Sequence, residues 1–319
     1  MHRRFEICVA ERGFILKIVR NPEKIKFNNA SVAIGKFDGL HRGHHILIDE
    51  LRKDKERGLT TVIFTFSKSP LTIEETSDVR YILTKDEKYH FYEQCGIDVV
   101  IEYPLCNSLI HMDREDFLKS ILIEKIGMKK IICGTDFKFG YMRKGTKEYL
   151  IENAEMYGYE VKVFEKLKEG IDDISSTLIR EHIRKGEIEA ANKLLGYPYM
   201  IVGEIVHGNE IGRTINYPTA NIIPDREKLL PPNGVYFTRV DIDGVSYKCI
   251  TNIGIKPTVT ENKMVGVESN IIGYHGDLYG RSLCFEFMHY HRTEKKFESL
   301  DELKKQLVSD EKCCKEYIM

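Results

Sequence analysis

The chain has 319 residues, 48 basic against 49 acidic side chains, and 42% hydrophobic residues. Its length favours two domains, and the balanced charge predicts no general attraction to nucleic acid or to a membrane. The eight cysteines form no CxxC pair, which argues against a zinc ribbon. No apolar run approaches the roughly 18 residues of a membrane span, and the start MHRRFEICVAERGF lacks a signal-peptide core. We therefore expect a cytoplasmic protein, a monomer or weak homo-oligomer, that binds neither nucleic acid nor membrane.

The first half of the chain alternates between strand-like and helix-like segments, in the order β-α-β-α-β-α-β-α-β. Helices are expected at 44–58, at 84–96 after the capping-box spacing of Thr84 and Glu87, from Asp113 onward, and at 146–159. Strands are expected at 31–37, 59–66, 97–103, 129–134 and 159–166. The run LTTVIFTF (59–66) is typical of a strand buried on both faces. This order predicts a doubly wound parallel sheet covered by helices.

The second half has a different pattern. Residues 175–196 predict two short helices separated by Gly186, and the capping-box spacing of Ser299 and Glu302 predicts a final helix. Between them, strands are expected at 199–208, 234–242, 245–254, 265–272 and 282–290, with a hairpin turn at Asp243-Gly244. We predict a small antiparallel β-barrel with a terminal helix, and we expect domains at 1–186 and 199–319 joined by a linker at 187–198.

The segment GKFDGLHRGHH (35–45) lies where the first predicted strand gives way to a helix. Ligands bind at such positions in open α/β sheets, and a helix N-terminus attracts phosphate. His41 and His44 are expected one turn apart there, able to donate hydrogen bonds to a phosphate that gains charge in a transition state. His45 is expected on the helix surface. A core turn with incidental histidines and a metal site are the alternatives.

This segment resembles the GxFDGxHxGH motif of the nucleotidyltransferase superfamily, in its FAD synthetase branch. Two further stretches, CGTDFKFGYMRKG (133–145) and ISSTLIR (174–180), resemble the GxDFxFGxxRxG and ISSTxIR motifs of the same family. The resemblance implies catalysis by His41 and His44. It implies flavin binding by Asp136, Phe137, Phe139 and Arg143, and ATP binding by Gly35, Phe37, Asp38, Gly39, Ser175, Ser176, Thr177 and Arg180.

The stretch GYMRKGTK (140–147) nearly spells a P-loop, GxxxxGK[ST], but its Lys and Thr are exchanged. Lys147 is then misplaced for a phosphate and no hydroxyl stands where magnesium needs one, so we reject a P-loop.

A second motif lies in the other half, GEIVHGNEIGRTINYPTANI (203–222). Thr and Asn oxygens suit Mg²⁺ that carries ATP phosphates, and a glycine-rich β-loop with Asn in a turn is the structural alternative. The stretch resembles the riboflavin kinase signature GxVxHGxxxGRxxGFPTAN, and GVYFTRV, NIGIKPT, VESNI, LYG and RTEKKF follow in the order of that family. The resemblance implies Glu268 as general base and Arg292 as a flavin contact or a contact to phosphate. It implies ATP binding by Gly203, Gly208, Gly212, Thr219 and Asn221, of which Thr219 and Asn221 also hold Mg²⁺ through the ATP phosphates.

Together the two halves resemble the prokaryotic bifunctional riboflavin kinase/FAD synthetases. This resemblance implies two reactions: riboflavin and ATP give FMN and ADP, and then FMN and a second ATP give FAD and pyrophosphate. Lys36, Asn216, Asn270 and Gly273 depart from the family pattern and leave room for one weakened activity. Two other readings are a flavin-binding regulator without catalysis and a single-activity adenylyl- or cytidylyltransferase with a structural β-domain.

Overall fold

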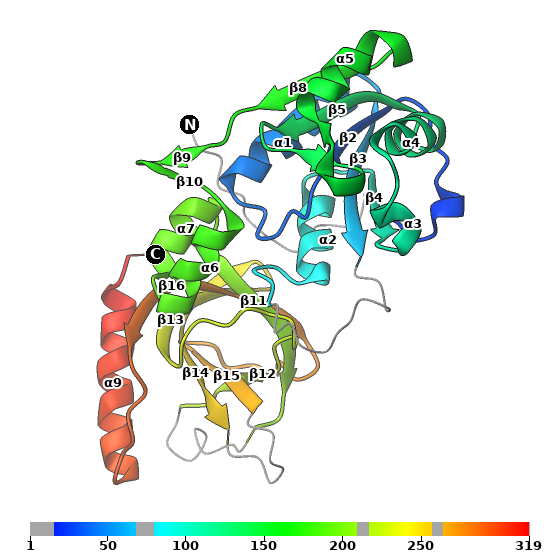
Figure 1. Cartoon of the computed structure of the whole chain (residues 1–319). Helices are drawn as coiled ribbons and strands as arrows, with labels where there is room; N and C mark the ends of the chain where they lie inside the picture. The colour runs from blue at the N-terminus through cyan, green and yellow to red at the C-terminus, as the bar shows by residue number, and fades with distance from the viewer. Residues whose placement is uncertain (1–15, 68–79, 209–216, 257–263, 319) are drawn as a thin grey trace. The chain divides into compact units, whose positions relative to one another are not determined.

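The computed structural model describes residues 16–67, 80–208, 217–256 and 264–318 (Figure 1). These residues divide into two compact units. The α/β unit contains residues 16–67 and 85–175, and the barrel unit contains residues 80–84, 176–208, 217–256 and 264–318. The predicted linker at 187–198 stays a prediction; it contains a helix, α7 (Ile188–Leu195). No helix in the described part of the chain is long and apolar enough to span a membrane.

The α/β unit is built on a parallel sheet of six strands in the order β1-β4-β3-β2-β5-β8. This order confirms the doubly wound sheet. The strands are β1 (Lys17–Val19), β2 (Ala30–Ile34), β3 (Thr60–Ser67), β4 (Val99–Pro104), β5 (Met128–Gly134) and β8 (Glu160–Phe164). The alternating pattern missed β1, a short edge strand that pairs with β4.

Helices occur at the four predicted places in this unit, and three further short helices, at 22–24, 107–110 and 141–143, were not predicted. They are η1 (Pro22–Lys24), α1 (Arg42–Glu56), α2 (Lys85–Gln94), α3 (Asn107–Ile110), α4 (Arg114–Asp116), the π-helical η3 (Phe117–Lys125), η4 (Tyr141–Arg143) and α5 (Lys147–Tyr157). Asp113 caps α4 as expected, because its carboxylate accepts a hydrogen bond from the Glu115 amide at 2.9 Å. Two small antiparallel pairs complete the unit: β6 (Lys138–Phe139) with β7 (Gly145–Thr146), and β9 (Lys168–Glu169) with β10 (Asp172–Asp173).

The two faces of the sheet are both buried. Val62, Ile63 and Phe64 of β3 are all fully buried, which confirms the reading of LTTVIFTF. Val62 and Phe64 share one face with the buried apolar side chains of η3 and α5. The other face is covered by α1, which packs on β2, β3 and β5. The N-terminus of α1 therefore lies at the carboxyl end of β2.

The barrel unit is a closed antiparallel barrel of six strands, with α6 (Ser176–Lys185), α7 and α9 (Leu300–Glu316) around it. Its strands are β11 (Tyr199–Val206), β12 (Ala220–Ile222), β13 (Gly234–Ile242), β14 (Val245–Lys256), β15 (Met264–Ile271) and β16 (Ser282–Arg292). The predicted hairpin is confirmed, because Asp243 and Gly244 both have positive φ, 53° and 82°. Ser299 caps α9 as expected by accepting a hydrogen bond from the Glu302 amide. The short strand β12 was not predicted.

A segment from the first half, Arg80–Thr84, belongs to the barrel unit. The Tyr81 amide donates to the Glu227 carbonyl at 2.7 Å, and the Leu229 amide donates to the Tyr81 carbonyl at 2.8 Å. The buried Lys228 ammonium donates to the Ile82 carbonyl at 2.8 Å. The barrel unit is therefore not made from the second half of the sequence alone.

Candidate active sites

The loop between β2 and α1 contains three residues with left-handed backbone. Phe37, Gly39 and Leu40 have φ of 47°, 79° and 36°, and both Phe37 and Leu40 are buried. Left-handed backbone costs free energy for residues with a side chain, so the surrounding packing must hold it. The Phe37 ring packs edge-on against Tyr92 of α2, with ring centroids 6.4 Å apart. Strained backbone of this kind is typical of a binding loop. Asp38 is also buried here, whereas Lys36 is exposed.

His41 and His44 lie together at the N-terminus of α1. His41 is the N-cap residue, and the two imidazoles stack with centroids 3.8 Å apart. A Cβ on Gly43 would lie 3.2 Å from the His41 ring, so glycine leaves space for that ring. The motif spacing HxGH thus has a packing reason. The Phe37 ring also contacts His44, with centroids 5.1 Å apart.

The electrostatics of this pair favour neutral imidazoles. Burial, with a smaller contribution from the nearby His45, lowers the pKa of His41 to about 4. Burial, with His41 and His45 as neighbours, also holds the pKa of His44 well below its usual value. Within the described residues, neither His41 Nδ1 nor His44 Nδ1 has a hydrogen-bond partner although both atoms are buried. Buried polar atoms are normally paired, so these two nitrogens indicate a ligand that has polar groups.

The expectation for His45 was wrong. Its side chain is buried, not on the helix surface, and it stacks on Phe91 of α2 with centroids 5.6 Å apart. The reason is that α2 covers this side of α1, which helical periodicity in α1 alone does not reveal.

The predicted flavin segment follows β5 in the same unit. Phe139 is buried, stacks on Phe137 and makes a tilted contact with Phe117, whereas Asp136 and Arg143 are exposed. Asp136 forms an ion pair with Lys166 at 3.0 Å. Arg143 has a left-handed φ of 60° in the turn that joins β6 to β7. The Phe139 ring packs against Gly145 at the end of this turn, and the exposed residues are the ones that a ligand can reach.

The residues of ISSTLIR are divided between the two units. Ser175 ends the α/β unit, and Ser176, Thr177 and Arg180 belong to α6 in the barrel unit. Ser176 begins the helix, which confirms the predicted helix start. Ser175 therefore belongs to the same unit as His41 and His44, whereas the other three residues belong to the barrel unit.

In the barrel unit, one row of side chains crosses three neighbouring strands. Glu268 of β15 pairs directly with Asn221 of β12 on one side and with Asn252 of β14 on the other. Directly opposite residues of paired strands point to the same face, so these three polar side chains lie side by side. Val267 and Ser269, the neighbours of Glu268, are fully buried on the opposite face. The predicted alternation is confirmed, and the Glu268 side chain lines a cavity of about 310 Å³ together with Asn252.

The Asn221 side chain packs closely against the backbone of Gly208. A Cβ on Gly208 would lie 2.1 Å from Asn221 Nδ2, so only glycine permits this close approach. A Cβ on Gly203 would likewise meet Ile222 at 2.5 Å. Gly212 and Asn216 lie outside the described residues. Asn270 donates to the Pro218 carbonyl at 2.8 Å and so fixes the backbone next to Thr219.

Two cavities of the barrel unit share Thr219. The cavity beside Glu268 is also lined by Arg292 and Asn270. Much of its wall is apolar and is formed by Val235, Ile250, Phe297, Leu303 and Leu307. A second cavity of about 530 Å³ has more polar walls, which include Tyr274, His275, Asp277 and Tyr279. His207 stacks on Tyr279 with centroids 3.6 Å apart. Thr219 therefore stands between an apolar and a more polar compartment.

Arg292 has a partner within the protein. Its guanidinium donates to the fully buried Asp310 carboxylate of α9, with the shortest distance 2.7 Å. Burial alone would raise the pKa of Asp310, but hydrogen bonds from Arg292 and Gln306 outweigh it and lower that pKa. The pair fastens α9 to β16 beside the cavity. Arg292 is thus placed to contact a ligand and to hold one wall.

The sequence interpretation gave no role to Asn252 or Asp310. Asn252 stands in NIGIKPT, a segment that matched the family pattern, so this signal was present but carried no residue assignment. Asp310 lies in a charged helix with no motif around it.

Among the described residues, no group of three or more His, Cys, Asp or Glu side chains could hold a metal ion, so the structure offers nothing for a histidine metal site there.

Comparisons with known proteins match the two halves of the chain to two families. A family model for FAD synthetase matches residues 23–178, and one for riboflavin kinase matches residues 195–318. The bifunctional riboflavin kinase/FMN adenylyltransferase of Escherichia coli strain K12 is 32% identical over 308 residues, which cover 95% of this chain and 97% of that protein. The protein of the same name from Bacillus subtilis strain 168 is 32% identical over 286 residues, 88% of this chain and 89% of that protein.

Among solved structures, a Streptococcus pneumoniae protein named a macrolide-efflux protein is similar over 96% of this chain and all of that chain. Its TM-score is 0.84 and its sequence identity is 29%.

Proposed function

The chain belongs to the bifunctional riboflavin kinase/FMN adenylyltransferase family, and on that premise we propose that both reactions use ATP with magnesium and that the two sites described above perform them. The protein phosphorylates riboflavin to FMN and adenylylates FMN to FAD. The row Asn221–Glu268–Asn252 beside Thr219 is the observation that carries the assignment of the kinase site.

In the kinase site we assign the apolar cavity to the flavin ring system and the more polar cavity to the nucleotide. Their common residue, Thr219, then lies where the γ-phosphate of ATP meets the 5′-hydroxyl of riboflavin. Glu268 takes the proton of that hydroxyl as the phosphoryl group is transferred, because a primary alcohol is a poor nucleophile at neutral pH.

Magnesium fits the residues present in this site. The Thr219 hydroxyl and the Asn221 amide oxygen are hard oxygen ligands. Gly208 has no side chain that would displace Asn221 from this position. Thr219 and Asn221 would hold the ion, which neutralises charge on the ATP phosphates when bound. A chelator is expected to stop both reactions and added magnesium to restore them. Full activity in the chelator would contradict this part of the proposal.

In the adenylyltransferase site the FMN phosphate displaces pyrophosphate from the α-phosphorus of ATP. His41 and His44 donate hydrogen bonds to the α-phosphate oxygens as these gain charge. Their low pKa values mean that each imidazole arrives neutral, with one N–H to donate. Residues Gly35 to Gly39, Ser175 to Thr177 and Arg180 are assigned to ATP, and the 133–145 segment to FMN.

The test of the kinase assignment is the substitution Glu268→Gln. It keeps the size and hydrogen bonding of the side chain but removes the proton acceptor, so riboflavin phosphorylation should fall by about 10²–10⁴-fold. Glu204→Gln, an exposed carboxylate on β11, is the matched control and should phosphorylate riboflavin at the normal rate.

Kinase turnover within a few-fold of wild type in Glu268→Gln would contradict the assignment. The regulator hypothesis makes a different forecast, since a protein that only binds flavin would convert neither riboflavin nor FMN. The single-activity hypothesis predicts FAD formation from FMN without any phosphorylation of riboflavin by the wild-type chain.

A further inference from the structure

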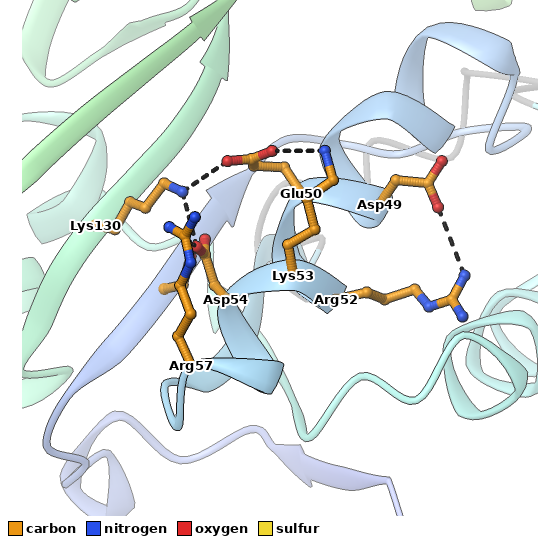
Figure 2. A network of polar contacts seen from close by, with 8 residues as sticks. Asp49, Glu50, Arg52, Lys53, Asp54, Arg57 and Lys130 are labelled. Atoms are coloured by element: carbon orange, nitrogen blue, oxygen red, sulfur yellow. Dashed lines mark hydrogen bonds and ion pairs between the residues drawn. The ribbon is translucent and has the colours of Figure 1, made fainter.

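A buried ion-pair network joins α1 to the sheet at the end of the helix far from His41 and His44 (Figure 2). The Lys130 ammonium of β5 donates to Asp54 at 2.8 Å and to Glu50 at 2.7 Å, both on α1. The Ser31 hydroxyl of β2 donates to the other Asp54 oxygen at 2.7 Å. Ser31 and Asp54 are fully buried and Lys130 is 5% exposed, so water contributes little to these groups.

The position of Lys130 depends on an irregularity in the sheet. Ala30 pairs with Met128, but the next residue, Ser31, pairs with Lys130, so β5 has one extra residue at Lys129. A β-bulge of this kind turns the following side chain to a new direction. Here it places Lys130 beside Ser31, on the face of the sheet that α1 covers.

Each of the three joined elements leads to part of the candidate adenylyltransferase site. β2 runs from Ser31 into the Gly35 loop, and β5 runs from Lys130 into the 133–145 segment. α1 begins after its cap residue His41, and Asp54 follows His44 by ten residues, which is about 15 Å along the helix axis. The network therefore fixes the relative position of the three elements that carry the site. It does so from the end of α1 that is far from the histidine pair.

Stability alone gives a poor reason for this network. Burying a lysine and two carboxylates costs desolvation, and well-packed apolar side chains of similar volume are often as stable. Leu47, Ile48 and Leu51 already provide α1 with an apolar face, but apolar contacts are not directional. Charged hydrogen bonds define distance and angle, which fixes the rotation and the axial position of a helix.

We propose that Lys130, Asp54 and Ser31 are positioning residues for FMN adenylyl transfer. They hold α1 in the one placement that aims His41 and His44 at the reacting phosphate. This inference rests on the proposed role of the histidine pair. A displacement of about 1 Å at reacting groups can lower a rate by about 10²-fold, so a small shift of α1 is sufficient.

The test compares two full-length variants. Lys130→Met leaves the buried Asp54 carboxylate with only the exposed Arg57 guanidinium, 3.7 Å away, as a cationic partner, and should lower both the melting temperature of the α/β unit and kcat for FAD formation. The triple variant Ser31→Ala, Asp54→Leu, Lys130→Met replaces the network with apolar groups and should recover the melting temperature. Its kcat for FAD formation should stay at least about tenfold low, with KM for FMN and ATP within about twofold of wild type. Glu50 keeps Lys53 as an ion-pair partner, and Lys55 still anchors the helix to Asp98.

Three controls separate positioning from a general structural role. Arg52→Met breaks the exposed Arg52–Asp49 pair on the same helix and should leave kcat unchanged. Riboflavin phosphorylation, measured on the same preparations, should be normal because its residues lie in the barrel unit. If the triple variant does not fold, Asp54→Asn takes its place, with the same expected loss of kcat at unchanged KM.

A kcat that returns together with the melting temperature in the triple variant would overturn the proposal, as would a normal kcat in Asp54→Asn. A separate variant, His44→Ala, distinguishes this failure from that of the proposed function. If His44→Ala is slow while the triple variant is fast, positioning is wrong and the histidine role stands. If His44→Ala keeps full activity, the histidine role itself fails.

Discussion

The two units build their candidate sites in different ways. In the α/β unit the central groups, His41, Gly43 and His44, come from one short stretch at a helix N-terminus. In the barrel unit Asn221, Glu268 and Asn252 come from three strands and meet only because of strand register. The first kind of site is local in sequence and depends on how one helix is placed. The second depends on the pairing of strands that are distant in sequence.

The largest effect in the α/β unit is expected from His44→Ala. Loss of one donor to the α-phosphate should slow FAD formation from FMN by about 10²–10³-fold, while riboflavin phosphorylation continues at its normal rate. Separation of the flavins by chromatography after incubation with each substrate measures both steps. Loss of both activities would show that the two sites are less independent than the comparison states.

Acid should weaken the α/β unit through the buried histidines. The pKa of His41 and of His45 is lowered to about 4, in both cases mainly by burial, from the ordinary 6.5. Between these values the unfolded chain binds more protons than the folded one, so the free energy of unfolding falls as pH falls from 6.5 toward 4. By pH 5 each of the two histidines should have lowered the free energy of unfolding by about 2 kcal/mol.

Urea unfolding of the α/β unit at pH 7 and pH 5 measures this loss. His45→Gln should show a smaller loss between the two pH values, because it contains one titrating group fewer. Equal free energies of unfolding at the two pH values in the wild-type chain would contradict the account of buried neutral imidazoles.

A smaller effect is expected from Lys228→Met in the barrel unit. The substitution removes the donor to the buried Ile82 carbonyl and loosens Arg80–Thr84, at a cost of about 1–3 kcal/mol in the free energy of unfolding. The matched control Lys305→Met changes an exposed lysine of α9 and should have little effect. Urea unfolding of the barrel unit compares them. An unchanged stability in Lys228→Met would mean that the segment from the first half adds nothing to this unit.

The sequence predicted most of the structural features that depend on residues close together in the chain. The HxGH spacing, the buried β3, the hairpin at Asp243-Gly244 and the caps at Asp113 and Ser299 follow from residue types a few positions apart. The alternation around Val267 also predicted correctly that Glu268 points away from the core face.

The features that escaped prediction depend on contacts distant in sequence. Asn252 acquires its place from register with Glu268, and Lys130 from a bulge that no composition signals. His45 is buried because α2 covers it. β12 is three residues long, too short for a recognisable pattern, yet it carries Asn221.

The central claim is that two separate sets of residues perform two successive reactions. Mixing equal amounts of the Glu268→Gln and His44→Ala proteins tests it most directly, with riboflavin, ATP and magnesium as the only substrates. Each variant alone should form FAD slowly, the first for lack of FMN and the second for lack of adenylyl transfer. The mixture should form FAD at a rate near that of wild type, because FMN made by one protein is used by the other. A mixture that makes FAD no faster than the better variant alone would contradict the account.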